Sequence, residues 1–333
     1  MPNLVRIAAL LYMMLSFDVL AAADCSARQA VGYRVLTMEN GRNIAVWYPA
    51  AASEQPMAYL RSTGGFMGSV AQDAPPAECP RVPLVLFSHG LGGCALQSLF
   101  LTEELARHGY VVAAPDHNDA VCRIGSDEHN FANMRADQSF LQPGLWTDRS
   151  QRDRLLDLRA VIDLIANDPQ LGPAVDVQRV GLIGHSLGGY TALGMAGAWP
   201  SWKHSDVKAV LALSPYVLPF IKRGTLARLD VPVMYQGGRF DAITPSLEGT
   251  RGAYALTSPP KYFVRLRGGT HLEWINLLCS GQPNVVECLK AKPNAYLIDR
   301  YGIEFLDRHL KNKPSALLEG NGTGLDRYRF QLP

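Results

Sequence analysis

The hydrophobic positions along the chain form two kinds of pattern. Some runs are short and almost entirely apolar, which is typical of strands that are buried on both faces of a sheet. These runs span residues 83–88, 111–114, 180–183, 209–213, 231–235 and 262–266. Other segments repeat their apolar residues every three or four positions, as amphipathic helices do. The predicted helices span residues 95–108, 151–167, 187–198 and 301–310.

Strand and helix patterns alternate along most of the chain. This order predicts an α/β fold, with a mostly parallel central sheet, helices on both of its faces and functional groups at the carboxyl ends of the strands. Residues 33–38 and 43–48 alternate in polarity around the turn Glu39-Asn40-Gly41, which predicts two antiparallel N-terminal strands. Since no internal repeat divides the chain, we expect a single domain over residues 24–333.

Three stretches lack a clear periodicity. Residues 49–83 are rich in Gly, Pro and Ala and are predicted to form a loop. Residues 119–148 could form a cap or lid, because long irregular segments inside compact domains are often functional. The sequence assigns no structure to residues 314–333.

The first 23 residues have the features of a secretory signal peptide. A basic residue comes first, residues 7–17 are apolar, and three alanines precede Asp24. Asp18 interrupts the apolar stretch, which is also shorter than the roughly 20 residues that a membrane-spanning helix needs. We therefore expect cleavage before Asp24, export to the periplasm or the cell exterior, and no transmembrane segment in the mature chain.

The six cysteines support an exported protein. An even number of cysteines in this compartment predicts disulfides, although six allow fifteen pairings. Cys279 and Cys288 are the best candidates for a pair because they flank one loop.

Composition and motifs exclude several functional classes. The formal charge is only +2 and no run of Lys or Arg is present, so nucleic acid is not an expected partner. Neither Cys-x-x-Cys nor His-x-x-x-His spacing occurs, and the glycine motifs lack the Gly-Lys-Ser/Thr of a phosphate-binding loop. The sequence thus predicts neither a metal site nor a cofactor, and it does not indicate an oligomeric state.

The strongest chemical motif is Gly184-His185-Ser186-Leu187-Gly188-Gly189. It follows a predicted strand and opens a predicted helix, which is the context of a nucleophile elbow. Small glycines at the flanking positions let the strand and the helix approach closely around a strained serine. Ser186 is therefore the candidate nucleophile.

A serine nucleophile needs a base, and the base needs an orienting carboxylate. In this elbow arrangement the three follow in the order Ser, Asp or Glu, His. Asp241 comes just after the run at 231–235, and His271 follows the run at 262–266 in a glycine-rich loop. They are the predicted acid and base. Asp116 is a rival acid because it also follows a strand, but it precedes the nucleophile in the chain.

Hydrolysis through a tetrahedral intermediate also needs backbone donors for the oxyanion. One comes from the residue after the nucleophile, which is Leu187. The turn Ser88-His89-Gly90-Leu91-Gly92-Gly93 follows the first buried run and fits the second position. The N–H groups of Leu91 and Leu187 are therefore the predicted oxyanion donors.

These motifs together resemble the dienelactone-hydrolase-like and platelet-activating-factor-acetylhydrolase-like branch of the α/β-hydrolases, which neighbours the bacterial cutinase-like polyester hydrolases. The matching segments are Val46-Trp47-Tyr48-Pro49, residues 87–93, residues 184–189, Asp241-Ala242-Ile243-Thr244-Pro245 and Gly269-Thr270-His271. The resemblance implies cofactor-free hydrolysis of carboxylic esters through an acyl-enzyme. Two departures leave the substrate open: true dienelactone hydrolases have a cysteine where this chain has Ser186, and no membrane-docking helix is evident.

The sequence leaves three functions to be distinguished. The first is a serine esterase acting on small or short-acyl esters. The second is a phospholipase A2 or acetylhydrolase, lipase or polyester hydrolase that works at a lipid or polymer surface, with Phe140–Trp146 or Tyr216–Ile221 as a possible apolar rim. The third is a non-catalytic binding protein, which would have no need of the three triad residue types.

Overall fold

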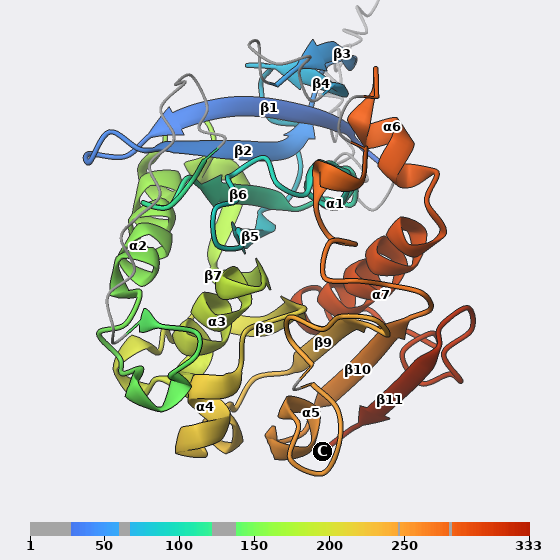
Figure 1. Cartoon of the computed structure of the whole chain (residues 1–333). Helices are drawn as coiled ribbons and strands as arrows, with labels where there is room; N and C mark the ends of the chain where they lie inside the picture. Colours follow the sequence, from blue (N-terminus) through green and yellow to red (C-terminus); the bar gives the residue numbers. More distant parts are fainter. Residues whose placement is uncertain (1–27, 60–66, 122–137, 246, 280–281) are drawn as a thin grey trace, which may run out of the picture.

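The computed structural model describes residues 28–59, 67–121, 138–245, 247–279 and 282–333. Its strands are β1 (Ala30–Thr37), β2 (Asn43–Ala50), β3 (Gln55–Ala58), β4 (Met67–Gln72), β5 (Val82–Ser88), β6 (Val111–Pro115), β7 (Val175–His185), β8 (Val207–Leu213), β9 (Val233–Gly238), β10 (Lys261–Leu266) and β11 (Arg327–Gln331). They form one sheet in the order β11-β10-β9-β8-β7-β5-β6-β2-β1-β4-β3 (Figure 1).

The centre of the sheet is parallel, as predicted. The six apolar runs become strands β5 to β10, and each pairs in parallel with its neighbours among the six. The N-terminal pair is antiparallel, with Tyr33 opposite Trp47, and β2 joins the parallel strands at β6 in antiparallel fashion. The predicted fold class is confirmed.

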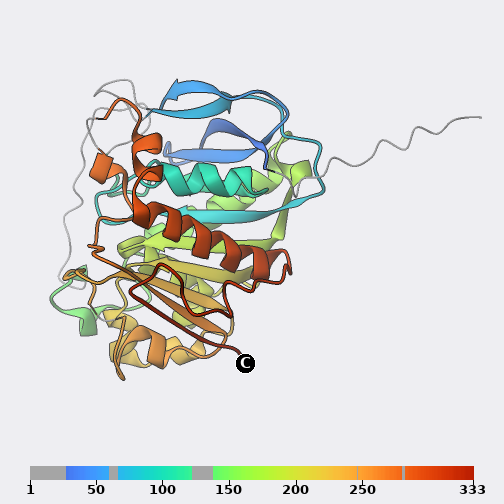
Figure 2. The ribbon, with the colours of Figure 1, turned by 90° about the vertical axis from the view of Figure 1, so that its right-hand side faces the viewer.

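Helices cover both faces of the sheet. They are α1 (Leu99–Arg107), α2 (Arg152–Asn167), α3 (Leu187–Leu193), α4 (Leu218–Arg223), α5 (Ala253–Leu256), α6 (Val285–Lys290) and α7 (Pro293–Leu310). Helices α2 and α7 lie on opposite sides of the sheet (Figure 1), and Figure 2 looks onto the face that α1 and α7 cover. Alternate residues of β5 enter the two cores: Leu84 and Leu86 pack with α2 and α3, while Val85 and Phe87 pack with α1 and α7.

The structure corrects the prediction in the segments of low apolar content. The predicted loop at 49–83 contains β3 and β4, and the unassigned C-terminus contributes β11. Strands β3 and β11 are the two edges of the sheet and are mostly exposed, and β4 lies between β3 and β1. None of the three has a continuous apolar run, so tertiary pairing decides their structure. Helix α1 begins at Leu99 rather than at residue 95, and the N–H of Ala95 donates to the Asp116 side chain (2.9 Å).

Other predictions have mixed outcomes. Cys279 and Cys288 form the predicted disulfide, with their Cα atoms 6.0 Å apart, and Cys79 and Cys94 are also disulfide-bonded. The proposed signal peptide and residues 122–137 of the proposed lid lie outside the described residues. In the part of the chain that is described, none of the helices combines the length and the apolar character needed to cross a membrane.

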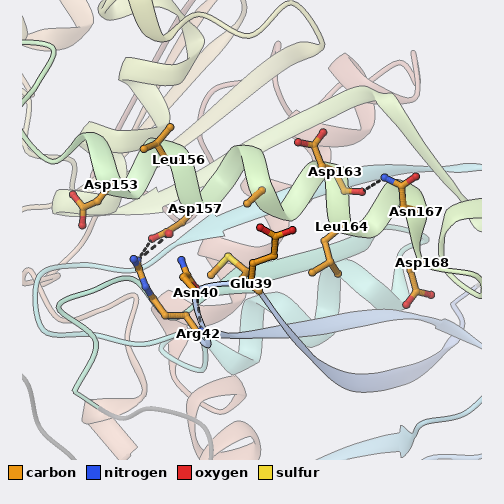
Figure 3. A pocket seen from close by; sticks show the side chains of 12 residues that line it. Glu39, Asn40, Arg42, Asp153, Leu156, Asp157, Asp163, Leu164, Asn167 and Asp168 are labelled. Atoms are coloured by element: carbon orange, nitrogen blue, oxygen red, sulfur yellow. Dashed lines mark hydrogen bonds and ion pairs between the residues drawn. The ribbon is translucent and has the colours of Figure 1, made fainter.

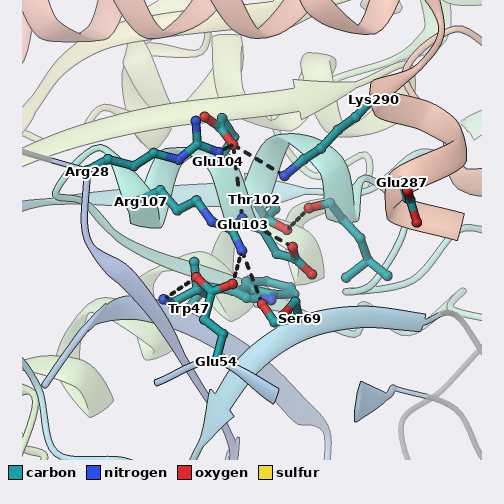
Figure 4. A network of polar contacts seen from close by, with 12 residues as sticks. Arg28, Trp47, Glu54, Ser69, Thr102, Glu103, Glu104, Arg107, Glu287 and Lys290 are labelled. Carbon is teal, nitrogen blue, oxygen red and sulfur yellow. Dashed lines mark hydrogen bonds and ion pairs between the residues drawn. The ribbon is translucent and has the colours of Figure 1, made fainter. Parts of the chain in front are cut away.

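A buried network joins α1 to the N-terminal strands (Figure 4). The Arg107 guanidinium pairs with Glu54 and Glu103 and donates to the carbonyl of Ser69 in β4 (3.1 Å). Glu103 has only 1% of its side chain exposed and also accepts a hydrogen bond from the Tyr59 hydroxyl (2.9 Å). Because a buried carboxylate is costly without a partner, Arg107 holds β4 and the residue before β3 to the helix.

Replacing Arg107 with Met should lower the free energy of unfolding by about 3 kcal/mol, because it leaves Glu103 buried and unpaired. Arg28→Met is the matched control: Arg28 pairs with Glu104 but is 61% exposed, so its loss should cost under about 1 kcal/mol. Urea unfolding of both variants measures the difference. If both variants lose the same free energy of unfolding, the Arg107 network does not stabilise the N-terminal strands more than an exposed ion pair does.

Candidate active site

A cavity of about 710 Å³ opens at the carboxyl ends of the parallel strands. The loops that follow β5, β7 and β10 all contribute to its wall, as expected for this type of sheet. Three of the five predicted site residues line it, namely Leu91, Ser186 and His271. Asp241 lies directly behind His271.

Ser186 stands at the sharp turn between β7 and α3. Its φ is +53° and its ψ is −114°, a conformation that a residue with a side chain rarely adopts. A Cβ atom on Gly184 would lie 2.1 Å from the carbonyl oxygen of Gly188, and one on Gly188 would lie 1.9 Å from that of Ser88. Both glycines are therefore required, because backbone touches backbone around the serine.

The loops after β9 and β10 bring Asp241 and His271 together. The Nδ1 of His271 lies 3.0 Å from Oδ2 of Asp241. The loops also contact each other directly: the N–H of Phe240 donates to the carbonyl of Gly269 (2.8 Å), and Gly238 has no room for a Cβ there. With Nδ1 directed at the carboxylate, the other ring nitrogen of His271 remains for a reacting group.

Asp241 is held as a carboxylate. Burial opposes its charge, but hydrogen bonds from His271 and from the backbone N–H of Thr244 outweigh this and keep the pKa of Asp241 well below its usual range. Its two oxygens also accept from the N–H of Ile243 (2.9 Å) and from the hydroxyl of Thr244 (2.8 Å). An ionised, fully hydrogen-bonded carboxylate is suited to orient an imidazole.

No hydrogen bond joins Ser186 to His271 among the described residues, although the two share the cavity. Such contacts are often long without substrate and tighten when it binds. The backbone of His271 is anchored by His185, whose Nε2–H donates to the His271 carbonyl (3.0 Å). Gln97 in turn donates to Nδ1 of His185 (3.1 Å), and burial lowers the pKa of His185 to about 3.

The two predicted oxyanion donors are available. Within the described parts of the chain, the N–H groups of Leu91 and Leu187 donate to no acceptor. Leu91 occupies the second position of a turn that the N–H of Gly93 closes onto the carbonyl of Gly90 (3.1 Å), with Gly92 at φ +62°. Both N–H groups are therefore free to donate to a new acceptor.

The rival acid Asp116 is placed elsewhere, since it holds the N–H of Ala95 ahead of α1. The sequence pattern did not identify Gln97 and His185 as residues that support the site. Their only mark in the sequence is that they lie in or near the glycine motifs. Thr244 could have been found, because a threonine three residues after an aspartate often bonds back to it.

Helix α2 departs from its amphipathic pattern. Its Arg and Asp residues fill the positions between the apolar ones, yet Arg154 and Asp157 are buried. Asp157 accepts from Nδ1 of His117 (2.9 Å), and Ser88 lies 2.8 Å from the other ring nitrogen. This second Ser-His-Asp chain has the contacts of a triad, but all three side chains are buried and none lines the main cavity, so it supports the sheet edge from within.

A second cavity of about 740 Å³ lies between the β1–β2 hairpin and α2 (Figure 3). Its wall is acidic, and the one arginine among its described lining residues, Arg42, is already paired with Asp157 (2.7 Å). None of the predicted site residues lines it. The described residues contain no group of three or more His, Cys, Asp or Glu side chains that could hold a metal ion.

Three buried histidines predict acid sensitivity. Burial lowers the pKa of His89, His117 and His185, so each is neutral in the folded protein. In the unfolded chain they titrate near pH 6.5. Below that pH the unfolded state binds protons that the folded state does not, so the free energy of unfolding should fall by up to about 1.4 kcal/mol per pH unit for each histidine.

The measurement is urea unfolding between pH 7.5 and pH 5. His185→Asn should reduce the slope by about one proton, because one of the three groups is gone. Equal slopes for the native protein and for His185→Asn would contradict a neutral, buried His185.

Comparisons with known proteins identify similar ester hydrolases. A family model described as platelet-activating factor acetylhydrolase, isoform II, matches residues 59–141. Cutinase 2 of Thermobifida cellulosilytica is 25% identical over 268 residues, which are 79% of this chain and 81% of that protein. The platelet-activating factor acetylhydrolase of Cavia porcellus is 22% identical over 334 residues, covering 84% of this chain and 73% of that protein.

A solved structure shares the fold. The ferulic acid esterase from Streptomyces cinnamoneus matches with a TM-score of 0.67 at 24% identity, over 93% of this chain and 98% of that chain.

Proposed function

Because this chain is an α/β-hydrolase of the group that includes cutinases and platelet-activating factor acetylhydrolases, we propose that it hydrolyses carboxylic esters through an acyl-enzyme formed on Ser186. In this proposal His271 is the general base and Asp241 orients it. The N–H groups of Leu91 and Leu187 stabilise the oxyanion. The single observation that carries the proposal is the Asp241–His271 pair opening into the same cavity as the strained Ser186.

The chemistry follows from these positions. The hydroxyl oxygen of Ser186 attacks the ester carbonyl while its proton passes to Nε2 of His271. The negative charge that develops on the carbonyl oxygen accepts hydrogen bonds from the two backbone donors. His271 then protonates the leaving alcohol. Water repeats the sequence on the acyl-enzyme and releases the acid, so the reaction needs no cofactor.

The wall of the cavity indicates the acyl group. Its described residues include no Lys, Arg, Asp or Glu, and its apolar members come from several loops, among them Phe140, Tyr216, Leu218 and Ile275. A charged acyl group would lose its hydration here without gaining a partner. We therefore infer neutral, apolar acyl chains as the substrate class.

A second candidate is action at a lipid or polymer surface. Large apolar side chains at the cavity wall are exposed: Leu141 is 93% exposed, Ile243 66% and Leu91 47%. Phe240, beside Asp241, is 64% exposed. Exposed apolar groups around a cavity mouth are costly in water and are typical of surfaces that meet another apolar phase.

The proposed lid and the proposed export belong to the same hypothesis. Phe140 and Leu141, from the described part of the stretch 119–148, line the cavity, which supports a covering role for that segment. The disulfide between Cys279 and Cys288 supports an oxidising compartment, and thus export after cleavage before Asp24. A non-catalytic binding role is disfavoured, because it would not require the strained serine.

The first test is hydrolysis of p-nitrophenyl esters, from acetate to palmitate, by the mature protein. Ser186→Ala should lose at least about 10³-fold in kcat, because the remaining groups cannot form an acyl-enzyme. Labelling of the native protein with a fluorophosphonate should modify Ser186. If the variant keeps its turnover, or if the native protein neither turns over esters nor is labelled, the proposal fails.

The second test separates the two substrate classes. Leu141→Gln and Ile243→Gln should lower the ratio of activity on an emulsified ester to activity on a soluble one by several-fold, since both changes remove apolar area that an interface would bury. Leu156→Gln is the matched control: it is 52% exposed on α2, beside the other cavity. An unchanged ratio in all three variants would favour the soluble esters.

A further inference from the structure

We infer that Arg154, on α2, is a positioning residue that orients the Leu91 N–H toward the reacting carbonyl. The inference rests on the proposed function, because it concerns one of the proposed oxyanion donors. Leu91 is on a short turn of the cavity wall, whereas Arg154 approaches this turn from the buried side of the sheet edge. Nothing in the amino-acid pattern connects the two.

The Arg154 side chain is completely buried and is directed at this turn. Its Nη1 donates to the carbonyl of His89 (2.7 Å), and its Nη2 donates to the carbonyl of Gly90 (3.3 Å). The same Nη2 contacts both carboxylate oxygens of Asp119 at 2.7 Å. The partners of Arg154 are therefore two carbonyls of the turn and the carboxylate of Asp119, which itself accepts a hydrogen bond from the turn.

The Gly90 carbonyl is the important partner. It belongs to the same peptide unit as the Leu91 N–H, and a planar trans peptide points its C=O and its N–H in opposite directions. Whatever holds the carbonyl therefore aims the N–H. Three donors hold it: Arg154, the Nδ1 of His89 (2.6 Å) and the N–H of Gly93 (3.1 Å).

His89 can act as a donor in only one tautomer. Its Nε2 accepts the backbone N–H of His117 (3.0 Å), so the ring proton must be on Nδ1, where it donates to Gly90. Burial and the neighbouring Arg154 lower the pKa of His89, which is consistent with a neutral ring. The histidine and the arginine therefore hold the same carbonyl.

Asp119 binds the turn on the other side of Leu91, and together Arg154 and Asp119 form a clamp around the Leu91 peptide. Its Oδ2 accepts the N–H of Gly92 (3.0 Å), so the Arg154–Asp119 pair binds backbone groups both before and after Leu91. The Arg154 charge also helps to keep the pKa of Asp119 below its usual range despite burial. A guanidinium can serve two carbonyls and a carboxylate at once, whereas an ammonium on a flexible stem cannot reproduce that fork.

The test begins with Arg154→Lys, which keeps the charge and loses the fork. We expect kcat on a p-nitrophenyl ester to fall about 10- to 100-fold with KM changed less than about twofold, because an oxyanion donor acts mainly in the transition state. Arg159→Lys is the matched control. Arg159 lies on the same helix but donates to the carbonyl of Trp202 (3.1 Å), away from the turn.

A double-mutant cycle with Leu91→Pro tests whether Arg154 affects catalysis through the Leu91 N–H. Proline removes the N–H, and it is common at the second position of a turn whose third residue has a positive φ, as Gly92 has here. Leu91→Pro alone should lower kcat about 10²- to 10³-fold. If Arg154 acts through this N–H, adding Arg154→Lys to Leu91→Pro should cost less than about twofold more.

Other outcomes overturn the inference. Equal losses from Arg154→Lys with and without Leu91→Pro, or a loss no larger than that of Arg159→Lys, would assign Arg154 a structural role only. If Arg154→Lys does not fold, as judged by thermal melting, Asp119→Asn replaces it in the cycle, with the same non-additivity expected. Failure of the proposed function is distinguishable, because the native protein would then show no turnover that depends on Ser186.

Discussion

Direct backbone contact between the end of β7, the start of α3 and the end of β5 is the constraint on which the site depends. Gly184 and Gly188 leave no room for side chains, so the chain reverses over Ser186 in a strained conformation. The strained backbone conformation of Ser186 is maintained because the surrounding strands and α3 are buried and closely packed, and cannot move to relieve it. The contact places the serine beside the turn that carries Leu91, so nucleophile and oxyanion donors are set by one packing arrangement.

The polar groups beneath this edge explain how irregular loops are held in place. The sheet edge holds a buried ion pair, Arg154–Asp119, and a half-buried one, Arg42–Asp157, together with neutral histidines that bond backbone atoms. Such groups are costly to bury and contribute little net stability compared with apolar packing. Their value lies in direction, because each hydrogen bond fixes the orientation of a specific peptide group. The site therefore exchanges some stability for a rigid arrangement of loops.

Sequence and structure agree best where burial is complete. Strands β5 to β10 were predictable because both of their faces are covered, which leaves a continuous apolar run. Edge strands β3 and β11, and β4 beside β3, were not predictable, since they have no continuous apolar run and depend on a neighbour for pairing. The apolar periodicity of α2 predicts that the charged residues between its apolar positions face solvent, but Arg154 is buried. Its long side chain donates to loop carbonyls inside the protein, and the pattern along the helix carries no information about those partners.

By itself, the sequence determined the fold class, the order of the elements and the candidate residues Ser186, Asp241 and His271, because these depend on local composition and on position relative to strands. The tertiary structure decided which groups meet. The contact of His271 with Asp241, the assignment of Asp116 to a different task and the clamp on the Leu91 peptide all join segments distant in the chain. Short-range pattern carries no information about such contacts, since they arise only when the sheet brings the ends of its strands to one edge.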